Sequence, residues 1–456
     1  MDWKGKRVVI LGAARQGTAL AAHFARQGAK VLLSDTRPED QFAAARQQLA
    51  DYKIEWQFGE PSEQMLKGAK GLFLSGGVSP QLSLVEIAMH RSIPISNDSQ
   101  AFMELAPCPV VGITGSAGKT TTTILVARML KAMEGNAFHA VWLGGNIGFP
   151  LISSVDQMQA TDIAVMELSS FQLELMTSSP HIAALLNLAP NHLDRHRTMA
   201  DYAAAKARIL DFQSDGDVAV LSREDFGSWA LRSRVKSTLW SFGLEAPSSP
   251  IPGTYVRGKD IWLRDQNGER RLFPLSIIQL RGEHNLLNVL AASAIAAVSG
   301  ADDKAIRFGV EGFSGAPHRL ELVRTVNGVD WFNDSIATSP QRAEASLRSF
   351  QRPVVLLLGG RDKGLPWTNL ARATKARAKA VVTFGEAASM IGDVLRNESS
   401  EVKMDSARDL EEAIALANRL AEDGDVVLLA PGGTSFDEFE DFEARGEHFR
   451  GLVNSI

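Results

Sequence analysis

A lysine and four threonines follow a glycine-rich turn near residue 115. The run reads Val110-Val-Gly-Ile-Thr-Gly-Ser-Ala-Gly-Lys-Thr-Thr-Thr-Thr123, an apolar strand that leads into a turn and then a helix beginning near Lys119. Backbone N–H groups of such a turn, together with the helix N-terminus, bind anionic oxygens. Lys119 is therefore expected on the β- and γ-phosphates of a nucleotide, and the Thr120 hydroxyl on Mg²⁺. The expected nucleotide contacts are Gly115, Ser116, Ala117, Gly118, Lys119, Thr120 and Thr121.

Two features bear on this interpretation. Only two residues separate Gly115 from Gly118, so an ordinary strand–turn–helix with an incidental Gly-Lys-Thr stays the alternative. Glu167 ends a later apolar strand, where its carboxylate can hold Mg²⁺ beside Thr120. Its alternative is an acid on the surface at a strand end.

A second glycine-rich turn, Gly12-Ala-Ala-Arg-Gln-Gly17, follows the first strand. It lacks the middle glycine of the dinucleotide fingerprint, so NAD binding is a weak hypothesis. Asp35 closes the next strand, where it could bind a ribose hydroxyl, and Arg37 could bind a phosphate or a uracil carbonyl. Because ligands settle at the carboxyl edge of parallel sheets, Ser75-Gly-Gly77 belongs to the same candidate site. Ordinary turns are the alternative.

The order of elements predicts an α/β protein with parallel sheets covered by helices. We expect three domains, at residues 1–108, 109–313 and 314–456, with Pro107-Cys-Pro109 as the first linker. A β-rich insertion is expected at 237–274 and a helix at Asn288–Ser299. The expected buried strands are Val8–Leu11, Lys30–Ser34, Gly71–Ser75, Val110–Ile113, Asp162–Met166, Ile182–Leu186, Val329–Phe332, Val354–Leu358, Ala380–Phe384 and Val426–Ala430.

Composition excludes several function classes. The net charge of -5 gives no basic surface for nucleic acid, and no apolar stretch reaches the ~20 residues that span a bilayer. The single cysteine, Cys108, excludes a disulfide framework and fits a reducing compartment. No signal peptide precedes the first strand. We therefore expect a cytoplasmic monomer that binds neither nucleic acid nor membrane.

The chain resembles the Mur ligases over essentially its whole length. Each matching motif is weak alone, and together, in this order, they are specific. They are Gly115-Ser-Ala-Gly-Lys-Thr, Gly144-Gly-Asn-Ile-Gly148, Glu167-Leu-Ser-Ser-Phe-Gln-Leu-Glu174, Asn191-His-Leu-Asp194, Ala205-Lys206, Gly282-Glu-His-Asn285, Pro317-His-Arg319, Asn333-Asp-Ser335 and Leu358-Gly-Gly360.

The resemblance implies a Rossmann-like UDP-binding domain, a central ATPase domain and a C-terminal Rossmann-like α/β domain. Within the family the chain is most similar to members that add D-glutamate to UDP-N-acetylmuramoyl-L-alanine in peptidoglycan precursor synthesis. Such enzymes use ATP to phosphorylate the substrate carboxylate, and the amine of the amino acid then attacks the acyl phosphate. The implied partners are UDP-N-acetylmuramoyl-L-alanine, glutamate and ATP, with two Mg²⁺ ions.

The resemblance also assigns residues. His192 and Lys206 join Thr120 and Glu167 as metal ligands, with Lys206 carbamylated by CO₂. Composition alone predicts an ordinary exposed lysine there, in an Ala-rich helix. With Lys119, these residues form the expected catalytic set: Lys119, Glu167, His192 and Lys206. The further ATP contacts are Asn285, Asn288, His318, Arg319 and Asp334; the UDP-substrate contacts are Arg15, Gln16, Asp35, Thr36, Arg37, Ser75, Gly77 and Asn146; and the glutamate contacts are Lys363, Ser435 and Phe442.

Several positions depart from the family pattern. Members often carry Asn-Asp-Ser-Lys where this chain has Asn333-Asp-Ser-Ile336. The isoleucine cannot make the ionic contact of the lysine. Ala117 stands where Asn is usual, and Asn191 where Asp often precedes the histidine. The enantiomer of glutamate, or another amino acid on the same ligase fold, therefore stays open. A P-loop regulatory or transport NTPase is a more distant alternative. Phe436 and Phe439 fit an apolar helical stripe with Phe442, which predicts core packing for the first two.

Overall fold

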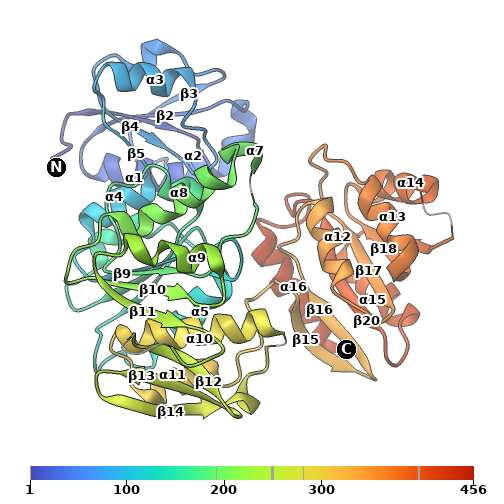
Figure 1. Cartoon of the computed structure of the whole chain (residues 1–456). Coiled ribbons are helices and arrows are strands. Elements are labelled where there is room, and N and C mark those ends of the chain that lie inside the picture. Colours follow the sequence, from blue (N-terminus) through green and yellow to red (C-terminus); the bar gives the residue numbers. More distant parts are fainter. Residues whose placement is uncertain (1, 192, 248–250, 281, 399–400) are drawn as a thin grey trace. The chain divides into compact units, whose positions relative to one another are not determined.

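The computed structural model describes residues 2–191, 193–247, 251–280, 282–398 and 401–456. The chain divides into two compact units, Met1–Phe313 and Ser314–Ile456. The first unit carries two β-sheets and the second carries one (Figure 1). The expected three-domain α/β architecture with sheets rich in parallel strands is confirmed. The boundary expected near residue 108 stays a prediction.

The N-terminal sheet has the order β3-β2-β1-β4-β5, and its strands pair in parallel. Because β1 lies between β2 and β4, the chain reverses its direction of winding there, and loops from both sides meet at the carboxyl edge. The strands are β1 Arg7–Leu11, β2 Lys30–Asp35, β3 Ile54–Phe58, β4 Ala69–Leu74 and β5 Ile95–Ser96. The helices are α1 Arg15–Arg26, η1 Glu39–Phe42, α2 Ala43–Gln48, η2 Glu63–Leu66, α3 Ser83–His90 and α4 Asp98–Leu105.

The central sheet has the order β14-β13-β12-β11-β10-β9-β6-β8-β7. β6 lies between β9 and β8, so the turn after β6 lies at a second reversal of winding. The strands are β6 Val110–Thr114, β7 Val141–Gly145, β8 Ile163–Glu167, β9 Ile182–Leu185, β10 Val218–Ser222, β11 Thr238–Phe242, β12 Gly253–Arg257, β13 Asp260–Asp265 and β14 Gly268–Pro274. The helices are α5 Lys119–Lys131, η3 Leu151–Ser153, η4 Val155–Gln157, α6 Ser170–Leu173, α7 Leu193–His196, α8 Met199–Asp211, α9 Phe226–Ala230, η5 Leu231–Arg234, η6 Leu275–Ile277, α10 Glu283–Val298 and α11 Asp303–Val310.

Two expectations for this region need correction. The β-rich segment at 237–274 is no separate insertion, because β11 pairs in parallel with β10 and β12 to β14 extend the same sheet. The helix expected to begin at Asn288 begins at Glu283, directly after Gly282, whose φ of 93° only glycine adopts readily. The polar residues before the apolar run hid this first turn from the periodicity.

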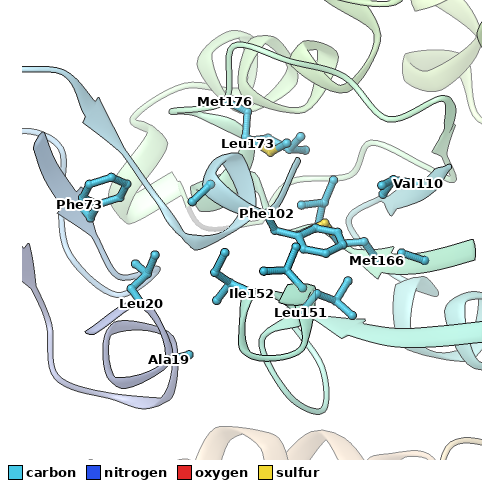
Figure 2. Packing of buried hydrophobic residues seen from close by; sticks show 14 of the residues in the cluster. Ala19, Leu20, Phe73, Phe102, Val110, Leu151, Ile152, Met166, Leu173 and Met176 are labelled. Carbon is cyan, nitrogen blue, oxygen red and sulfur yellow. The ribbon is translucent and has the colours of Figure 1, made fainter. Parts of the chain in front are cut away.

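A shared apolar core joins the two sheets of the first unit. Figure 2 shows Leu20 of α1 and Phe102 of α4 facing Ile152 of η3 and Met166 of β8. Both Leu20 and Phe102 are fully buried. Burial of large apolar side chains contributes roughly 1.5–3 kcal/mol each, so this core holds the N-terminal sheet against the central one. The carboxyl edges of the two sheets are thereby fixed relative to each other.

The second unit has a sheet of order β15-β16-β20-β17-β18-β19, in which the described strands β15 and β16 pair antiparallel and the other neighbouring strands pair in parallel. Its strands are β15 Glu321–Val326, β16 Val329–Asn333, β17 Val354–Gly359, β18 Ala378–Phe384, β19 Lys403–Ser406 and β20 Val426–Gly432. Its helices are α12 Pro340–Arg348, α13 Thr368–Arg377, α14 Ala388–Glu398, α15 Leu410–Leu420 and α16 Phe442–Ser455.

The apolar stripe expected around Phe436 is wrong for that residue. Phe436 is 60% exposed, because α16 begins only at Phe442 and the preceding residues form turns rather than a helix. Phe439 is partly buried against the core of the second unit. Among the described residues, no helix has both the length and the apolar character to cross a bilayer.

Candidate active site

The glycine-rich loop connects β6 to α5 as the sequence predicts. Gly118 stands at the N-cap of α5 with a φ of 81°, the left-handed region in which a side chain is strained. A Cβ built on Gly118 would lie 2.2 Å from the Oδ1 of Asn288, a buried residue of α10. Asn288 therefore packs directly under the loop, and its partner Asn285 accepts a 3.2 Å hydrogen bond from it.

Residues that sequence reasoning missed brace this loop from the other side. Asn187, after β9, accepts from the Ala117 N–H over 2.8 Å and donates to the Ala117 carbonyl over 3.1 Å. The Tyr202 hydroxyl lies 3.0 Å from the Ser116 hydroxyl. Tyr202 precedes Lys206 by four residues, which places both on one face of α8, and that spacing was the available signal.

Thr120, Glu167 and Asn146 form one hydrogen-bonded group at the carboxyl edge of the central sheet. The Thr120 hydroxyl donates to Glu167 Oε2 over 2.8 Å, and the Asn146 amide donates to Glu167 Oε1 over 2.8 Å. Glu167 is buried at the end of β8. Hydroxyl, carboxylate and amide oxygens are ligands that suit Mg²⁺.

Two lysines approach the same loop. Lys119 Nζ donates to the Gly115 carbonyl over 3.0 Å, curling back over the turn. Lys206 is 1% exposed and donates to Gly115 O over 3.0 Å and to Thr114 Oγ1 over 3.1 Å. Burial, with the charge of Lys119, lowers the pKa of Lys206 well below its usual value. The exposed lysine that composition predicts there is wrong.

The remaining member of the expected metal set, His192, lies outside the described residues. Within the part of the chain that the structure describes, no three His, Cys, Asp or Glu side chains gather into a metal cluster. Glu167 is thus the one described carboxylate of the expected set, beside a hydroxyl and a lysine.

At the edge of the N-terminal sheet, Asp35 and Arg37 bind each other. Asp35 accepts from Arg37 Nε and NH2, both at 3.0 Å, and from the Ala13 N–H at 2.8 Å. Burial opposes its ionisation, but these hydrogen bonds outweigh burial and hold the pKa of Asp35 below its usual value. A cavity of about 70 Å³ opens here, lined by Leu11, Gly12, Ser34, Asp35, Thr36, Pro61, Val78 and Leu82.

The other residues expected for the UDP substrate surround this edge. Gln16 accepts a 2.7 Å hydrogen bond from the Gly76 N–H, which ties the first turn to the loop after β4. Ser75 is buried, and the remaining three, Arg15, Thr36 and Gly77, are exposed. Asn146 is not among them, since it belongs to the Glu167 group.

In the second unit, His318 and Asp334 are buried and Arg319 is exposed. The Asn333 amide lies 3.0 Å from His318 Nδ1, and burial lowers the pKa of His318. Asp334 accepts from the Leu320 N–H over 3.0 Å and from the Ser346 hydroxyl, and burial raises its pKa.

The three residues expected for glutamate lie in the second unit. Lys363 Nζ donates to the Thr338 hydroxyl over 3.2 Å. Ser435 is buried in the loop after β20, and Phe442 begins α16, where its carbonyl accepts from the Ser335 hydroxyl over 2.8 Å. Buried Arg445 donates to the Thr434 carbonyl over 3.1 Å and to Ser335. It thereby links the loop after β20 to the loop after β16.

The fold and the loop after β6 define a nucleotide-binding α/β protein of the phosphate-loop type. Three family models match the chain: "Mur ligase MurD-like, N-terminal domain" at residues 6–97, "Mur ligase middle domain" at 113–296 and "Mur ligase, glutamate ligase domain" at 318–433. The chain belongs to the Mur ligase family, whose members are ATP-dependent ligases. This excludes the oxidoreductase and regulatory NTPase alternatives.

Relatives match along the full chain. A UDP-N-acetylmuramoylalanine–D-glutamate ligase from Koribacter versatilis is 39% identical over 100% of this chain and 99% of its own. One from Acetivibrio thermocellus is 37% identical over 99% and 97%. Among solved structures, UDP-N-acetylmuramate–alanine ligase MurC from Thermotoga maritima aligns with a TM-score of 0.54 at 19% identity over 99% of both chains, which shows the shared fold.

Proposed function

We propose that this chain is a UDP-N-acetylmuramoylalanine–D-glutamate ligase of peptidoglycan precursor synthesis. The full-length likeness to relatives of that name supports the choice of substrates. The observation that carries the chemistry is the convergence of Lys119, Thr120, Glu167 and Lys206 on one loop at the edge of the central sheet. A phosphate-bearing nucleotide, a metal and an anionic substrate can meet there.

The reaction has two steps. A carboxylate oxygen of the alanyl group attacks the γ-phosphorus of ATP, the bond to the β-phosphate oxygen breaks, and ADP leaves. The amine of D-glutamate then attacks the acyl carbon, inorganic phosphate leaves with the attacking carboxylate oxygen, and the nitrogen loses a proton. Lys119 and the loop N–H groups bind the phosphates, and Asn285, Asn288, His318, Arg319 and Asp334 supply further nucleotide contacts.

The Thr120 hydroxyl and the Glu167 carboxylate fit Mg²⁺ by donor chemistry, since both supply oxygens and these lie 2.8 Å from each other. His192 is proposed as a further metal ligand on the family resemblance alone. Two bound ions would neutralise the repulsion between the transferring phosphoryl group and the substrate carboxylate. Asn146 donates to the Glu167 carboxylate and so orients it, and we propose that it contacts the muramoyl or acyl-phosphate end of the substrate.

Lys206 fits a carbamate. Its amine reacts with CO₂ only when neutral, and burial beside Lys119 lowers its pKa in the required direction. Attack of the amine nitrogen on CO₂ forms an N–C bond and releases one proton, which converts a cation into a carboxylate-like ligand. That anion would relieve the repulsion between Lys206 and Lys119 and add an oxygen ligand for the metal.

The uridine diphosphate moiety and glutamate are assigned to the two other sheets. We propose that the uridine diphosphate end occupies the N-terminal edge, where it contacts Asp35, which lines the cavity, and Arg37, which is hydrogen-bonded to Asp35. Lys363, Ser435 and Phe442 are proposed for glutamate, whose carboxylates need cationic and hydroxyl donors. We also infer a cytoplasmic monomer, in keeping with the supply of ATP and with a single, buried cysteine.

The proposal is tested by phosphate release from ATP with UDP-N-acetylmuramoyl-L-alanine and a panel of D- and L-amino acids. D-Glutamate alone should support rapid release. Preference for L-glutamate would overturn the assigned enantiomer, and release with another amino acid only would overturn the assigned subclass. Light scattering of the same sample checks the monomer.

A further inference from the structure

Three basic side chains bind one short segment of the second unit, Ser335–Thr338, between β16 and α12. Arg445 donates to the Ser335 carbonyl and hydroxyl, each over 3.0 Å. Arg342, in the first turn of α12, donates to the Ile336 carbonyl over 3.4 Å. Lys363 donates to the Thr338 hydroxyl over 3.2 Å. The three cations therefore surround the segment in which the family's lysine is replaced by Ile336.

The acids whose charges act on these cations are Asp437 and Glu438 for Arg445 and Asp334 for Arg342, and none forms an ion pair with them. Among the described residues, no carboxylate oxygen lies within 4.0 Å of a side-chain nitrogen of Arg342, Lys363 or Arg445. Partial desolvation first, and then the charges of Arg342 and Arg445, lower the pKa of Lys363. An anion bound at Arg342 and Lys363 would relieve the repulsion between their like charges.

The three side chains differ in what they can reach. Arg445 is 1% exposed, and its guanidinium donates its hydrogen bonds to Ser335 and to the carbonyls of Gly433 and Thr434. It therefore holds the segment in place. Arg342 and Lys363 are exposed, and their bonds to the segment leave donors available to a ligand. A planar guanidinium beside an ammonium suits a carboxylate, which accepts two hydrogen bonds side by side.

We propose that Arg342 is a substrate-binding residue that, together with Lys363, holds a carboxylate of the incoming amino acid and supplies the cation that Ile336 cannot. This inference rests on the proposed function and extends it by one residue. It explains how a chain with isoleucine at position 336 keeps selectivity for an amino acid with two carboxylates. A phosphate oxygen of the nucleotide is the competing ligand, and steady-state kinetics separate the two.

The test compares Arg342→Ala with Arg348→Ala, a control on the same helix whose arginine pairs with Glu344. Arg342→Ala should raise the KM for D-glutamate roughly 10- to 100-fold, the effect of losing a charge-assisted hydrogen bond. The KM values for ATP and the UDP substrate should change less than about 3-fold. Lys363→Ala should show the same pattern, and Arg348→Ala none of it.

A second variant guards against a folding defect. Ile336→Lys combined with Arg342→Ala restores a cation at the segment and should recover most of the affinity for D-glutamate, while thermal unfolding confirms that each protein is folded. A raised KM for ATP instead of D-glutamate, an unchanged KM for D-glutamate, or no recovery in the folded double variant would each overturn the proposal. Failure of wild-type turnover with D-glutamate would instead overturn the proposed function.

Discussion

The Thr120 hydroxyl at the start of α5 donates a 2.8 Å hydrogen bond to the Glu167 carboxylate at the end of β8. The two residues reach the same point because β6 and β8 are adjacent parallel strands, so the loop after β6 and the last residue of β8 lie at one edge of the sheet. The pair links the phosphate loop to an acid that suits a divalent cation.

Lys119→Ala should lower kcat at least ~10²-fold, because it removes the cation that stabilises charge on the transferring phosphoryl group. Lys131→Ala, at the exposed end of the same helix, is the matched control and should leave kcat unchanged. The measurement is ATP-dependent ligation under saturating substrates. Near wild-type turnover by folded Lys119→Ala would contradict the assignment of the nucleotide site to this loop.

Lys206→Ala should be nearly inactive and should recover part of its activity with added short carboxylic acids, which replace the carbamate oxygens. The same acids should not rescue Lys119→Ala, whose defect is a lost cation. ¹³C-Bicarbonate should give a carbamate resonance in the wild type that Lys206→Ala lacks. An active wild-type enzyme without that resonance would contradict the carbamate.

Gly118→Ala and Gly135→Ala separate backbone strain from crowding at the phosphate loop. The two glycines have φ values of 81° and 79°, but only at Gly118 does an added Cβ meet a neighbour within 4 Å, Asn288 Oδ1 at 2.2 Å. Strain alone costs about 1–2 kcal/mol in each variant. We therefore expect a raised KM for ATP and a greater loss of thermal stability only in Gly118→Ala. Equal effects in both variants would mean that the Asn288 contact is not tight.

Asp98 should make the first unit less stable as pH rises. It is buried with Oδ1 unpartnered, and burial raises its pKa from 3.8 to about 7. Between pH 3.8 and about 7, the folded protein keeps the Asp98 proton, whereas the unfolded chain releases it. The free energy of unfolding therefore falls by about 1.4 kcal/mol per pH unit until the pH passes the pKa of the folded state.

Asp98→Asn removes this titration. Its unfolding midpoint relative to the wild type should therefore be higher at pH 8 than at pH 4, whereas the exposed loop variant Asp215→Asn should show no such change. A difference between Asp98→Asn and the wild type that is the same at both pH values would contradict the raised pKa.

The phosphate loop could be predicted from sequence because its residues are contiguous and their spacing has a mechanism. Thr120 and Glu167 could be paired because Thr120 follows one buried parallel strand and Glu167 ends another. The burial of Lys206 could not be predicted, because the composition of an alanine-rich helix does not indicate which face of the helix packs inward. Arg342 was missed for a related reason: its partners, Ile336 and Lys363, come together only through the turn between β16 and α12 and the loop after β17.

Errors at element boundaries have local causes. α10 begins five residues before the start that the apolar pattern predicts, because its first turn is polar. Phe436 lies outside the core, although the spacing of these turn residues matches a helical period. In both cases the prediction rests on the apolar pattern alone. That pattern does not reveal a polar first turn of a helix, and it does not distinguish a short turn segment from a helix.

The central claim is tested most directly with UDP-N-acetylmuramoyl-L-alanine labelled with ¹⁸O in the alanyl carboxylate. Transfer of a carboxylate oxygen to phosphorus predicts that each inorganic phosphate released during turnover with D-glutamate carries one ¹⁸O, and that the product gains the mass of glutamate less one H₂¹⁸O. Unlabelled phosphate, or no turnover with D-glutamate, would contradict an acyl-phosphate D-glutamate ligase.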